Sequence, residues 1–385
     1  MASGDRKPRV LVAAEWFTPA FRAGGPIRSV ANLVEVLGET HDVWVVAGAY
    51  DLAQTQPLPD LPLNEWIERP WGHVMYLTHD RWKKSLWQQL INEELLPDYI
   101  YLNSLFARFF ALIPLRIARL NSATQIVLAP RGMLGPGALA IKSMKKRLFL
   151  FLAKKLGWFK GVRWHASSVV EASDIARQIP NASIQIASNV PSSIPTEEKK
   201  VPDDRKVLVV LGRIHAIKNI EFGMQAVEKA VGGMVNPSVV EIQLIGPAED
   251  AVYLERLLSR RNRIRSVVVE HLGALNPADV SKALLGAHYL LMPSLHENYG
   301  HAIVEAWAHG CPVFLSDRTP WTGLAVQGVG WDWPLELDTW AEGLRGAFLS
   351  EDSVWKKQSQ AAQHHFNTVV RSPEILDANR RIFSA

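Results

Sequence analysis

Cysteine and long apolar runs are almost absent from this sequence. A single cysteine, Cys311, can form neither an intramolecular disulfide nor a cysteine-based metal site, which favours a reducing cytoplasm. No run of 18 or more apolar residues occurs, and the segment Val10–Ala14 is too short for the core of a signal peptide. The sequence therefore predicts a cytoplasmic protein without a membrane-spanning helix.

Two common phosphate-binding motifs are also missing. The sequence contains no G-x-G-x-x-G dinucleotide fingerprint and no G-x-x-x-x-G-K-[ST] P-loop. Internal repeats and low-complexity tracts are absent as well, which argues against a solenoid or a disordered chain.

The composition is that of a globular protein with two domains. A length of 385 residues fits two domains, because single domains typically have about 100–200 residues. Hydrophobic residues make up 48% and charged residues 21% of the chain, which is enough to build sizeable cores. The net charge of +4 is divided unevenly: residues 1–190 carry an excess of positive charge and residues 191–385 an excess of negative charge. We therefore expect the two halves to face different partners.

Short β-branched runs alternate with helical patterns along both halves, which predicts the α/β class with two parallel sheets. Helical patterns include Arg28–Leu37 and Leu105–Leu120, and a helical tail begins at Asp352 and breaks near Ser372–Pro373. The predicted strands are Val10–Ala14, Val43–Ala47, Tyr99–Leu102, Gln125–Ala129 and Arg163–Ala166 in the first half, and Lys206–Leu211, Val240–Ile245, Val267–Leu272, Tyr289–Met292 and Pro312–Leu315 in the second.

A segment rich in proline, serine and charge separates the two sheets. It reads NVPSSIPTEEKKVPDD, a composition that a core strand would not tolerate. We predict an N-terminal Rossmann-like domain over 1–190, a linker over 191–204 and a second Rossmann-like domain over 205–365. The segment 366–385 is expected to form a helix that could pack back on the first domain.

Two motifs follow predicted strands of the second half, where open α/β sheets bind ligands. In LGRIHAIKN, Gly212 allows a sharp turn, and Arg213 and Lys218 offer two cations that could clamp a diphosphate. Taken alone, this motif fits a diphosphate clamp and a loop with solvated charges equally well.

The second motif, LHENYGHAIVEAWAHGCPVFLSD, carries two glutamates at the start of a helix. Glu297 precedes the helix and Glu305 lies within it, eight residues later. The backbone N–H groups of Tyr299, Gly300 and His301 would be the first donors of that helix and could bind an anion with Asn298 beside them. For an isolated pair of glutamates, a helix-start charge and a salt-bridged helix residue would be the preferred explanation.

Together, the two motifs resemble those of the group-1 (family 4) retaining glycosyltransferases, which have the GT-B fold. The resemblance covers essentially the whole chain and includes AEWFTPAFRAGGPIRSV, APRGMLGPGALAIKSMKKRL, WHASSVVEASDI and SDRTPW. It is closest to the branch that builds bacterial capsules, O-antigens (the outer part of lipopolysaccharide) and exopolysaccharides. The resemblance implies two domains that face each other across a cleft.

The resemblance also implies roles for individual residues. Arg213 and Lys218 would hold the diphosphate of a nucleotide-sugar donor, Glu297 would contact the transferred sugar, and Glu305 would bind the ribose. The implied reaction retains the anomeric configuration and needs no metal ion or other cofactor, and the sequence contains no Asp-x-Asp motif. A pair of hydrolytic carboxylates is the rival interpretation of the two glutamates.

Residues of the first half are candidates for the acceptor side of the cleft. Gly24 and Gly25 would allow close approach of donor phosphate or acceptor. Many relatives carry a histidine where this chain reads YLNSLF, so we assign no catalytic base. The remaining candidates are Trp16, Arg28, Asn103, Arg131 and His165, although a lone histidine among apolar neighbours favours a core residue at His165. Trp321 is a further candidate near the cleft.

One segment concentrates the positive charge of the first half. Residues 141–163 contain eight Lys/Arg and no acidic residue, interleaved with apolar side chains that we expect to lie mostly in the core. This composition is typical of a helix at an anionic membrane surface, and a core-packed helix with a solvated basic face is the alternative. The cations expected to face lipid, or a pyrophosphate-linked acceptor, are Lys142, Lys145, Lys146, Arg147, Lys154 and Lys155.

These expectations combine into one functional hypothesis. The protein would transfer a sugar from a nucleotide-diphosphate sugar to a growing, lipid-linked glycan on the cytoplasmic face of the membrane, and it would not bind nucleic acid. A non-catalytic nucleotide-sugar or glycan-binding subunit and a nucleotide-sugar epimerase are the alternatives.

Overall fold

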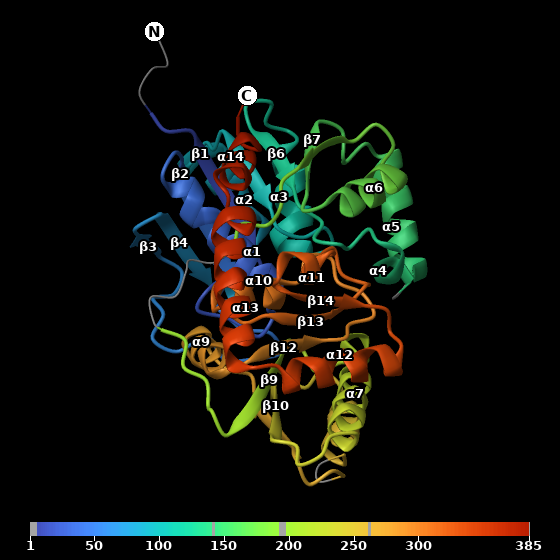
Figure 1. The fold of residues 1–385 in the computed structure, drawn as a ribbon. Helices are drawn as coiled ribbons and strands as arrows, with labels where there is room; N and C mark the ends of the chain where they lie inside the picture. Colours follow the sequence, from blue (N-terminus) through green and yellow to red (C-terminus); the bar gives the residue numbers. More distant parts are fainter. Residues whose placement is uncertain (1–5, 141–142, 192–197, 261–262, 385) are drawn as a thin grey trace. The chain divides into compact units, whose positions relative to one another are not determined.

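The computed structural model describes residues 6–140, 143–191, 198–260 and 263–384, and it contains two compact units. Unit 1 comprises residues 1–190 and 373–385, and unit 2 comprises residues 191–372. Figure 1 labels helices and strands of both units. Part of the predicted linker and the candidate Lys142 lie outside the described residues.

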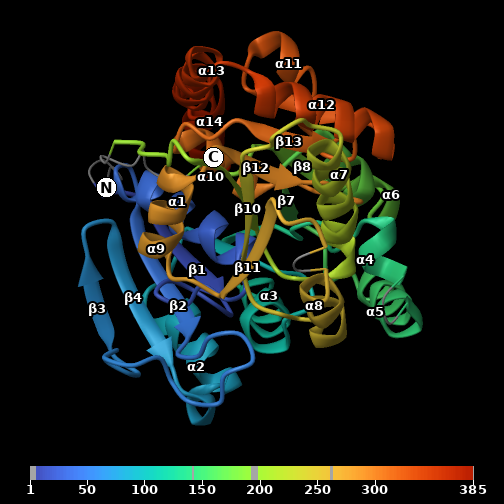
Figure 2. The same cartoon turned by 60° about the horizontal axis from the view of Figure 1, so that its bottom comes forward.

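Unit 1 is built on an eight-stranded sheet with the order β3-β4-β2-β1-β5-β6-β7-β8. All neighbouring strands are parallel except β3 and β4, which form a hairpin at one edge of the sheet (Figure 2). The strands are β1 (Arg9–Ala14), β2 (Asp42–Gly48), β3 (Trp66–Arg69), β4 (Gly72–Leu77), β5 (Tyr99–Leu102), β6 (Gln125–Leu128), β7 (Val162–Ala166) and β8 (Ser183–Ile186). The helices are α1 (Gly25–Gly38), α2 (Lys84–Gln89), α3 (Ile113–Ala118), α4 (Pro136–Ala140), α5 (Ser143–Lys155), α6 (Val169–Gln178) and α14 (Pro373–Arg381).

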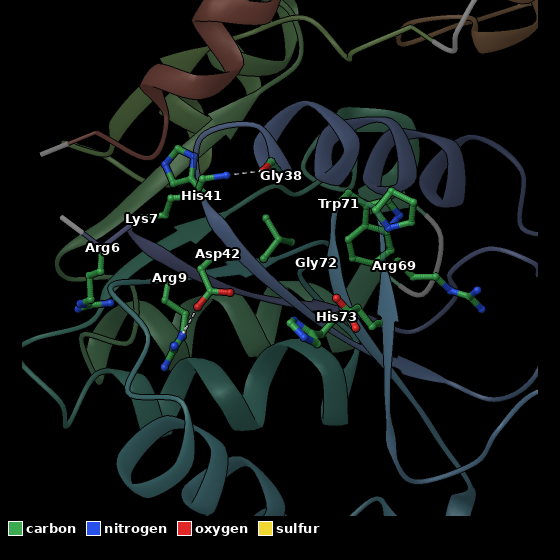
Figure 3. A pocket seen from close by; sticks show the side chains of 13 residues that line it. Arg6, Lys7, Arg9, Gly38, His41, Asp42, Arg69, Trp71, Gly72 and His73 are labelled. Atoms are coloured by element: carbon green, nitrogen blue, oxygen red, sulfur yellow. Dashed lines mark hydrogen bonds and ion pairs between the residues drawn. The ribbon is translucent and has the colours of Figure 1, made fainter.

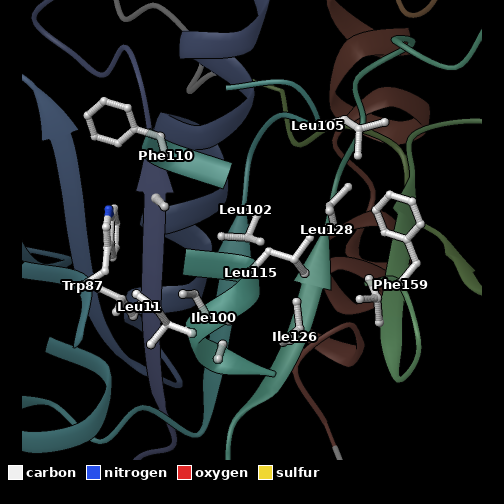
Figure 4. Packing of buried hydrophobic residues seen from close by; sticks show 14 of the residues in the cluster. Leu11, Trp87, Ile100, Leu102, Leu105, Phe110, Leu115, Ile126, Leu128 and Phe159 are labelled. Atoms are coloured by element: carbon white, nitrogen blue, oxygen red, sulfur yellow. The ribbon is translucent and has the colours of Figure 1, made fainter. Parts of the chain in front are cut away.

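Apolar strands form the centre of unit 1. β1 and β5 are buried almost throughout, as expected for parallel strands covered on both faces. Figure 4 shows Leu11, Ile100 and Leu128 from the sheet packing with Leu115 of α3, with Trp87 and Phe110 nearby. A second cluster on the other face includes the C-terminal residues Ile382 and Phe383.

Unit 2 has a six-stranded, wholly parallel sheet with the order β11-β10-β9-β12-β13-β14. Its strands are β9 (Arg205–Leu211), β10 (Val239–Ile245), β11 (Val267–Gly273), β12 (Tyr289–Met292), β13 (Val313–Ser316) and β14 (Gly330–Trp333). Its helices are α7 (Ile220–Gly232), α8 (Ala251–Leu258), α9 (Pro277–Gly286), α10 (His301–Ala308), α11 (Leu324–Gln327), α12 (Leu337–Leu349) and α13 (Asp352–His365).

The structure confirms the predicted α/β class and contains a strand at each of the ten predicted places. The sequence analysis missed β3, β4, β8 and β14, and all but β4 lie at sheet edges. The helix predicted over Leu105–Leu120 is shorter than expected. It consists of a π-helical turn at Arg108–Leu112 followed by α3, where Pro114 lies in the first turn and needs no N–H partner.

Candidate active site

The loops after β9 and β12 lie next to each other at the carboxyl edge of the unit 2 sheet. β9 pairs directly with β12 because the chain first builds the sheet outward from β9 to β11 and then returns to the other side of β9. A reversal of strand order of this kind is where open α/β sheets bind ligands. The sheet therefore brings the two motifs of the second half together.

The loop after β9 turns at Gly212 and presents Lys218. Gly212 has a φ of 144°, which favours glycine, and the chain then forms a short 3₁₀ turn over Ala216–Lys218. Asn219 is left-handed with a φ of 52° and leads into α7. Lys218 Nζ donates a hydrogen bond to Glu297 Oε1 over 2.5 Å, so the lysine reaches across to the loop after β12.

Glu297 is held in place from several sides. Its Oε1 also accepts a hydrogen bond from Ser294 Oγ at 2.9 Å, and its backbone N–H donates to Arg318 O at 3.2 Å. Ser316 Oγ in turn donates to Ser294 O at 2.5 Å, which fixes the loop against the end of β13. The carboxylate is thereby pre-positioned, as a substrate-orienting group must be.

The Lys218–Glu297 ion pair is largely withdrawn from water. The side chains retain only 19% and 12% of their exposure. Paired charges at this depth interact more strongly than at the surface, because less solvent screens them. An incoming anionic ligand could bind the lysine in the same weakly screened environment.

Glycine also shapes the start of α10. Gly300 is left-handed with a φ of 78° and precedes the first residue of the helix, His301. The indole N–H of Trp321 donates to Tyr299 O at 2.6 Å and anchors the turn before the helix. Asn298, His301 and the half-buried Glu305 each have an interaction partner.

Arg213, which the sequence analysis offered as a cation for a diphosphate, already forms an ion pair within unit 2. Its Nη1 donates to Glu249 Oε1 at 2.6 Å, and both side chains are substantially exposed. The sequence analysis did not single out Glu249, which follows β10 in the GPAED segment. Ser294 and Ser316 were also missed, although Ser294 stands only three residues before Glu297.

In the part of the chain that the structure describes, no group of three or more His, Cys, Asp or Glu side chains could hold a metal ion.

Arg131 and Asn103 lie together at the carboxyl edge of unit 1. Arg131, left-handed with a φ of 54°, donates through Nε to Asn103 Oδ1 at 2.8 Å and through Nη1 to Asn189 Oδ1. Its Nη2 donates to Tyr101 Oη at 2.6 Å. Three nitrogens of the guanidinium are thus engaged within unit 1 itself.

His165 continues this hydrogen-bonded chain into the core. Tyr101 Oη donates to His165 Nδ1 at 2.9 Å, and His165 Nε2 donates to Ala187 O at 2.9 Å, which defines a neutral imidazole. Burial lowers the pKa of His165 to about 3, assisted by the nearby charge of Arg131. The structure therefore places His165 as a buried, fully bonded side chain.

The glycine loop of unit 1 is tied to the end of β2. Asp51 is buried, and its carboxylate accepts hydrogen bonds from the backbone N–H groups of Phe21 and Arg22 at 3.0 to 3.2 Å. Gly24, with a φ of 67°, precedes α1, and Gly25 begins it. Trp16 and Arg28 are half-buried on either side of this loop in the sequence.

The basic segment contains α5, and its apolar residues correct one expectation. We predicted that they lie mostly in the core, but Met144, Leu148, Phe151, Leu152 and Leu156 are 46–84% exposed. Leu150, Ala153 and Phe159 are the buried members. The exposed and buried sets follow the helical period, so α5 has one apolar face against the core and another toward solvent.

The predicted membrane-facing cations differ in their surroundings. Lys145, Arg147 and Lys155 are exposed, and Lys154 is exposed but donates to Gln178 O at 3.2 Å. Lys146 points inward instead: its Nζ donates to Ala138 O and lies 5.4 Å from the centre of the Phe106 ring. None of the helices in the described part of the chain is long and apolar enough to cross a bilayer.

Two hollows of about 470 and 540 Å³ lie at the opposite, amino edge of the unit 1 sheet. In the first, Arg9 pairs with Asp42 and Lys7 donates to Gly38 O, while Trp71 and His73 line the other side (Figure 3). Neither hollow contains a predicted donor or acceptor residue, and of the predicted membrane-facing cations Lys154 lines the second.

Comparison with known proteins supports the interpretation of the motifs. The family described as "Family 4 Glycosyltransferase in conflict systems" matches residues 160–325. An uncharacterized glycosyltransferase of Methanocaldococcus jannaschii is 29% identical over 116 residues, which is 30% of this chain. The matched region spans only 28% of that relative.

Solved structures match almost the entire chain in fold. Sucrose-phosphate synthase from Thermosynechococcus elongatus has a TM-score of 0.69 at 15% identity, with 96% of each chain covered. Anabaena HepE, in complex with UDP and glucose, has a TM-score of 0.67 at 15% identity, covering 97% of this chain and 98% of its own. The chain therefore has the GT-B fold, with two parallel-sheet α/β domains, and resembles the group-1, family-4 glycosyltransferases.

Proposed function

We propose that the protein is a retaining, metal-independent glycosyltransferase that uses a nucleotide-diphosphate sugar as its donor. The observation that carries the proposal is the Lys218–Glu297 pair at the strand-order reversal of unit 2. It combines a cation suited to a leaving diphosphate with a carboxylate suited to sugar hydroxyls. HepE binds UDP-glucose in one of its crystal structures, which supports a donor of this class.

In the proposed reaction, the donor diphosphate binds Lys218 of the Lys218–Glu297 pair. Lys218 and Arg213 bind the diphosphate and stabilise the negative charge that develops as it leaves. Glu297, held by Ser294, orients the transferred sugar, and Glu305 binds the ribose. Asn298, Tyr299, Gly300 and His301 supply the helix-start side of the donor site.

The proposed bond changes occur on one face of the sugar. The bond between the anomeric carbon and the diphosphate oxygen breaks, and a bond from the acceptor hydroxyl oxygen forms on the same face. The acceptor proton passes to the departing phosphate oxygen, so no base, metal ion or cofactor is required.

Donor binding and turnover test this proposal together. We expect one of UDP-, GDP- or ADP-sugars to raise the Tm, because a ligand that binds only the folded state stabilises it. Glu297→Gln should abolish transfer to a pooled acceptor extract while the protein remains folded. Donor binding without turnover in the unmutated protein would indicate a binding subunit, and sugar interconversion without an acceptor would indicate an epimerase.

We propose that the acceptor is a growing, lipid-linked glycan of a surface polysaccharide and that α5 binds the anionic inner face of the cytoplasmic membrane. Its exposed residues Met144, Leu148, Phe151 and Leu152 follow helical spacing, and Lys145, Arg147 and Lys155 lie in the same helix. Apolar side chains beside cations are typical of helices that lie in an anionic interface.

Vesicle sedimentation tests the membrane proposal. Neutralising Lys145, Arg147 and Lys155 to glutamine should weaken binding to phosphatidylglycerol-containing vesicles about 100-fold, because each cation contributes about 1 kcal/mol. Replacing three exposed cations of unit 2, Lys229, Lys282 and Arg318, provides a charge-matched control. Equal binding by both triple variants would refute the role of α5.

A further inference from the structure

A row of aromatic side chains lies at the carboxyl edge of unit 1, outside every residue considered so far. Tyr50 follows β2 by two residues, and His79 follows β4 by two residues. Because β2 and β4 are parallel neighbours, these residues lie at the same edge of the sheet. Their rings stack with centroids 3.9 Å apart and an interplanar angle of 4°.

Trp82 extends the row at nearly a right angle. Its ring centroid lies 4.6 Å from that of His79, with planes inclined by 79°. Phe109 stacks on Trp82 at 5.5 Å, so His79 and Trp82 are each supported by a second aromatic ring. His79 is exposed, whereas Tyr50 and Trp82 are half-buried. The result is a rigid corner of two rings with solvent access.

The backbone of Glu15 lies beside this corner. Glu15 directly follows β1, the neighbour of β2, and Gly48 N donates to Glu15 O at 3.2 Å. A Cβ at Gly48 would lie 2.7 Å from Glu15 O and 3.3 Å from a Trp82 ring carbon, so only glycine allows this close approach. The Glu15 backbone and the Trp82 ring thus both lie against Gly48 at the end of β2.

The Glu15 side chain has no hydrogen-bond or ion-pair partner among the described residues. The other carboxylate at this edge, Asp51, is committed to three backbone N–H groups, those of Phe21, Arg22 and Leu52. The Arg131 guanidinium is committed to Asn103, Asn189 and Tyr101. Burial raises the pKa of Glu15, which makes its carboxylate a better hydrogen-bond acceptor for a neutral hydroxyl.

We infer that Glu15, Tyr50, His79 and Trp82 form a carbohydrate-binding subsite for a sugar ring of the acceptor. The apolar C–H face of the ring packs against His79 and Trp82, and Glu15 accepts a hydrogen bond from one of its hydroxyls. Apolar walls with a few fixed polar groups are typical of small-ligand sites, and aromatic rings provide large, rigid contact surfaces. This inference rests on the proposed function, because it names the part of unit 1 that holds the acceptor.

Ligand-detected NMR tests the subsite without requiring turnover. The probes are the methyl glycosides of glucose, galactose, mannose and N-acetylglucosamine, with glycerol as a reference that has hydroxyls but no ring. We expect saturation transfer to at least one glycoside and none to glycerol. His79→Ala and Glu15→Gln should each weaken that binding at least fivefold, and Glu15→Asp should restore only part of it.

His73 provides the matched control. It stacks on Trp44 with centroids 4.0 Å apart, at the start of β4 rather than after its end. His73→Ala removes a stacked histidine from the same strand but should leave glycoside binding unchanged. Equal effects of His73→Ala and His79→Ala would overturn the subsite, as would unchanged binding in both His79→Ala and Glu15→Gln.

The outcomes also separate this inference from the proposed function. Glycoside binding that depends on His79 and Glu15, in a protein that transfers no sugar, would retain the subsite and refute the transferase. Sugar transfer with an acceptor KM unchanged in His79→Ala and Glu15→Gln would retain the transferase and refute the subsite. The nucleotide sugar that raises the Tm of the unmutated protein serves as a control: an equal Tm increase in each variant shows that unit 2 remains intact.

Discussion

The two units arrange their central strands alike, but the side chains at the corresponding places differ. In each sheet the first strand has the second strand on one side and a later strand on the other: β1 lies between β2 and β5, and β9 lies between β10 and β12. At the carboxyl edge of unit 2, the ion pair of Lys218 with Glu297 lies at this reversal of strand order. At the carboxyl edge of unit 1, the corresponding places hold the amide of Asn103 and Glu15, whose carboxylate has no partner in the described part of the chain.

The difference shows how one topology can serve two kinds of ligand. A lysine at the reversal suits a charged diphosphate, whereas a carboxylate with aromatic rings and amides suits an uncharged sugar. The strand order determines where a ligand binds, and the side chains after each strand determine which ligand it is. Four predictions test this contrast, beginning with the largest expected effect.

Removing the unit 2 lysine should have the largest effect. We expect Lys218→Ala to lower kcat/KM about 10³-fold, because it removes a preorganised cation from a leaving group in a weakly screened site. The measurement is sugar transfer under donor-limited conditions. Lys229→Ala on α7 is the control, since Lys229 pairs with Asp338 at the surface. A Lys218→Ala protein that is folded and fully active would disprove the donor site.

Removing the unit 1 arginine should instead reduce stability. Arg131→Met leaves Asn103, Asn189 and the Tyr101 hydroxyl without their donor. We expect a loss of about 2–4 kcal/mol in the free energy of unfolding, since hydrogen bonds to a charged group contribute about 1.5–3 kcal/mol each and partly compensate when lost together. Urea denaturation measures it. Unchanged stability combined with lost transfer would show that Arg131 contacts the substrate.

Acid should destabilise the protein through its buried neutral histidines. Burial lowers the pKa of His165 in unit 1 and of His288 in unit 2 to about 3. The unfolded histidines titrate near 6.5, so this contribution is present above that pH and is lost as the pH falls from about 6.5 toward 3. Between pH 7 and pH 5 the loss is roughly 2 kcal/mol for His165.

The variant His165→Gln isolates the contribution of unit 1 to this pH dependence. It should be less stable at pH 7 but should show a shallower decline in unfolding free energy between pH 7 and pH 5. An identical slope in the variant and the unmutated protein would mean that His165 is protonated in the folded state.

The smallest effect concerns Arg213. Glu249→Gln should release this arginine from its ion pair and tighten donor binding about two- to fivefold, because exposed ion pairs contribute about 0–1 kcal/mol. Isothermal titration with the donor would detect this change. Weaker donor binding would indicate that Glu249 itself contacts the donor.

The sequence is sufficient to predict the sheets but not all contacts of the candidate site. Apolar runs such as VLVVL in β9 are stable only as strands covered by helices on both faces, so the strands can be predicted. The positions of the motifs, directly after these strands, then follow. Which partner a charged side chain selects depends on distances between loops remote in sequence. The pairing of Arg213 with Glu249, 36 residues away, has no local signal.

The aromatic corner was missed for a similar reason. Tyr50, His79 and Trp82 meet because β4, which has few β-branched residues, lies beside β2. Because β4 was not predicted, the sequence analysis could not place His79 and Trp82, which follow it, beside Tyr50. Glu15 could have been noticed, because it directly follows a predicted strand, but only the structure shows that its carboxylate is unpaired.

The buried residues Ile382 and Phe383 have a consequence for synthesis of the chain. They lie in the core of unit 1, where His41 Nε2 contacts Phe383 O and Asn379 Nδ2 donates to Ser188 O. Unit 2, by contrast, is formed by one continuous stretch of residues. Unit 1 therefore begins to emerge from the ribosome before unit 2 but can complete its core only after residue 383 has left the exit tunnel, when all of unit 2 has already been synthesised.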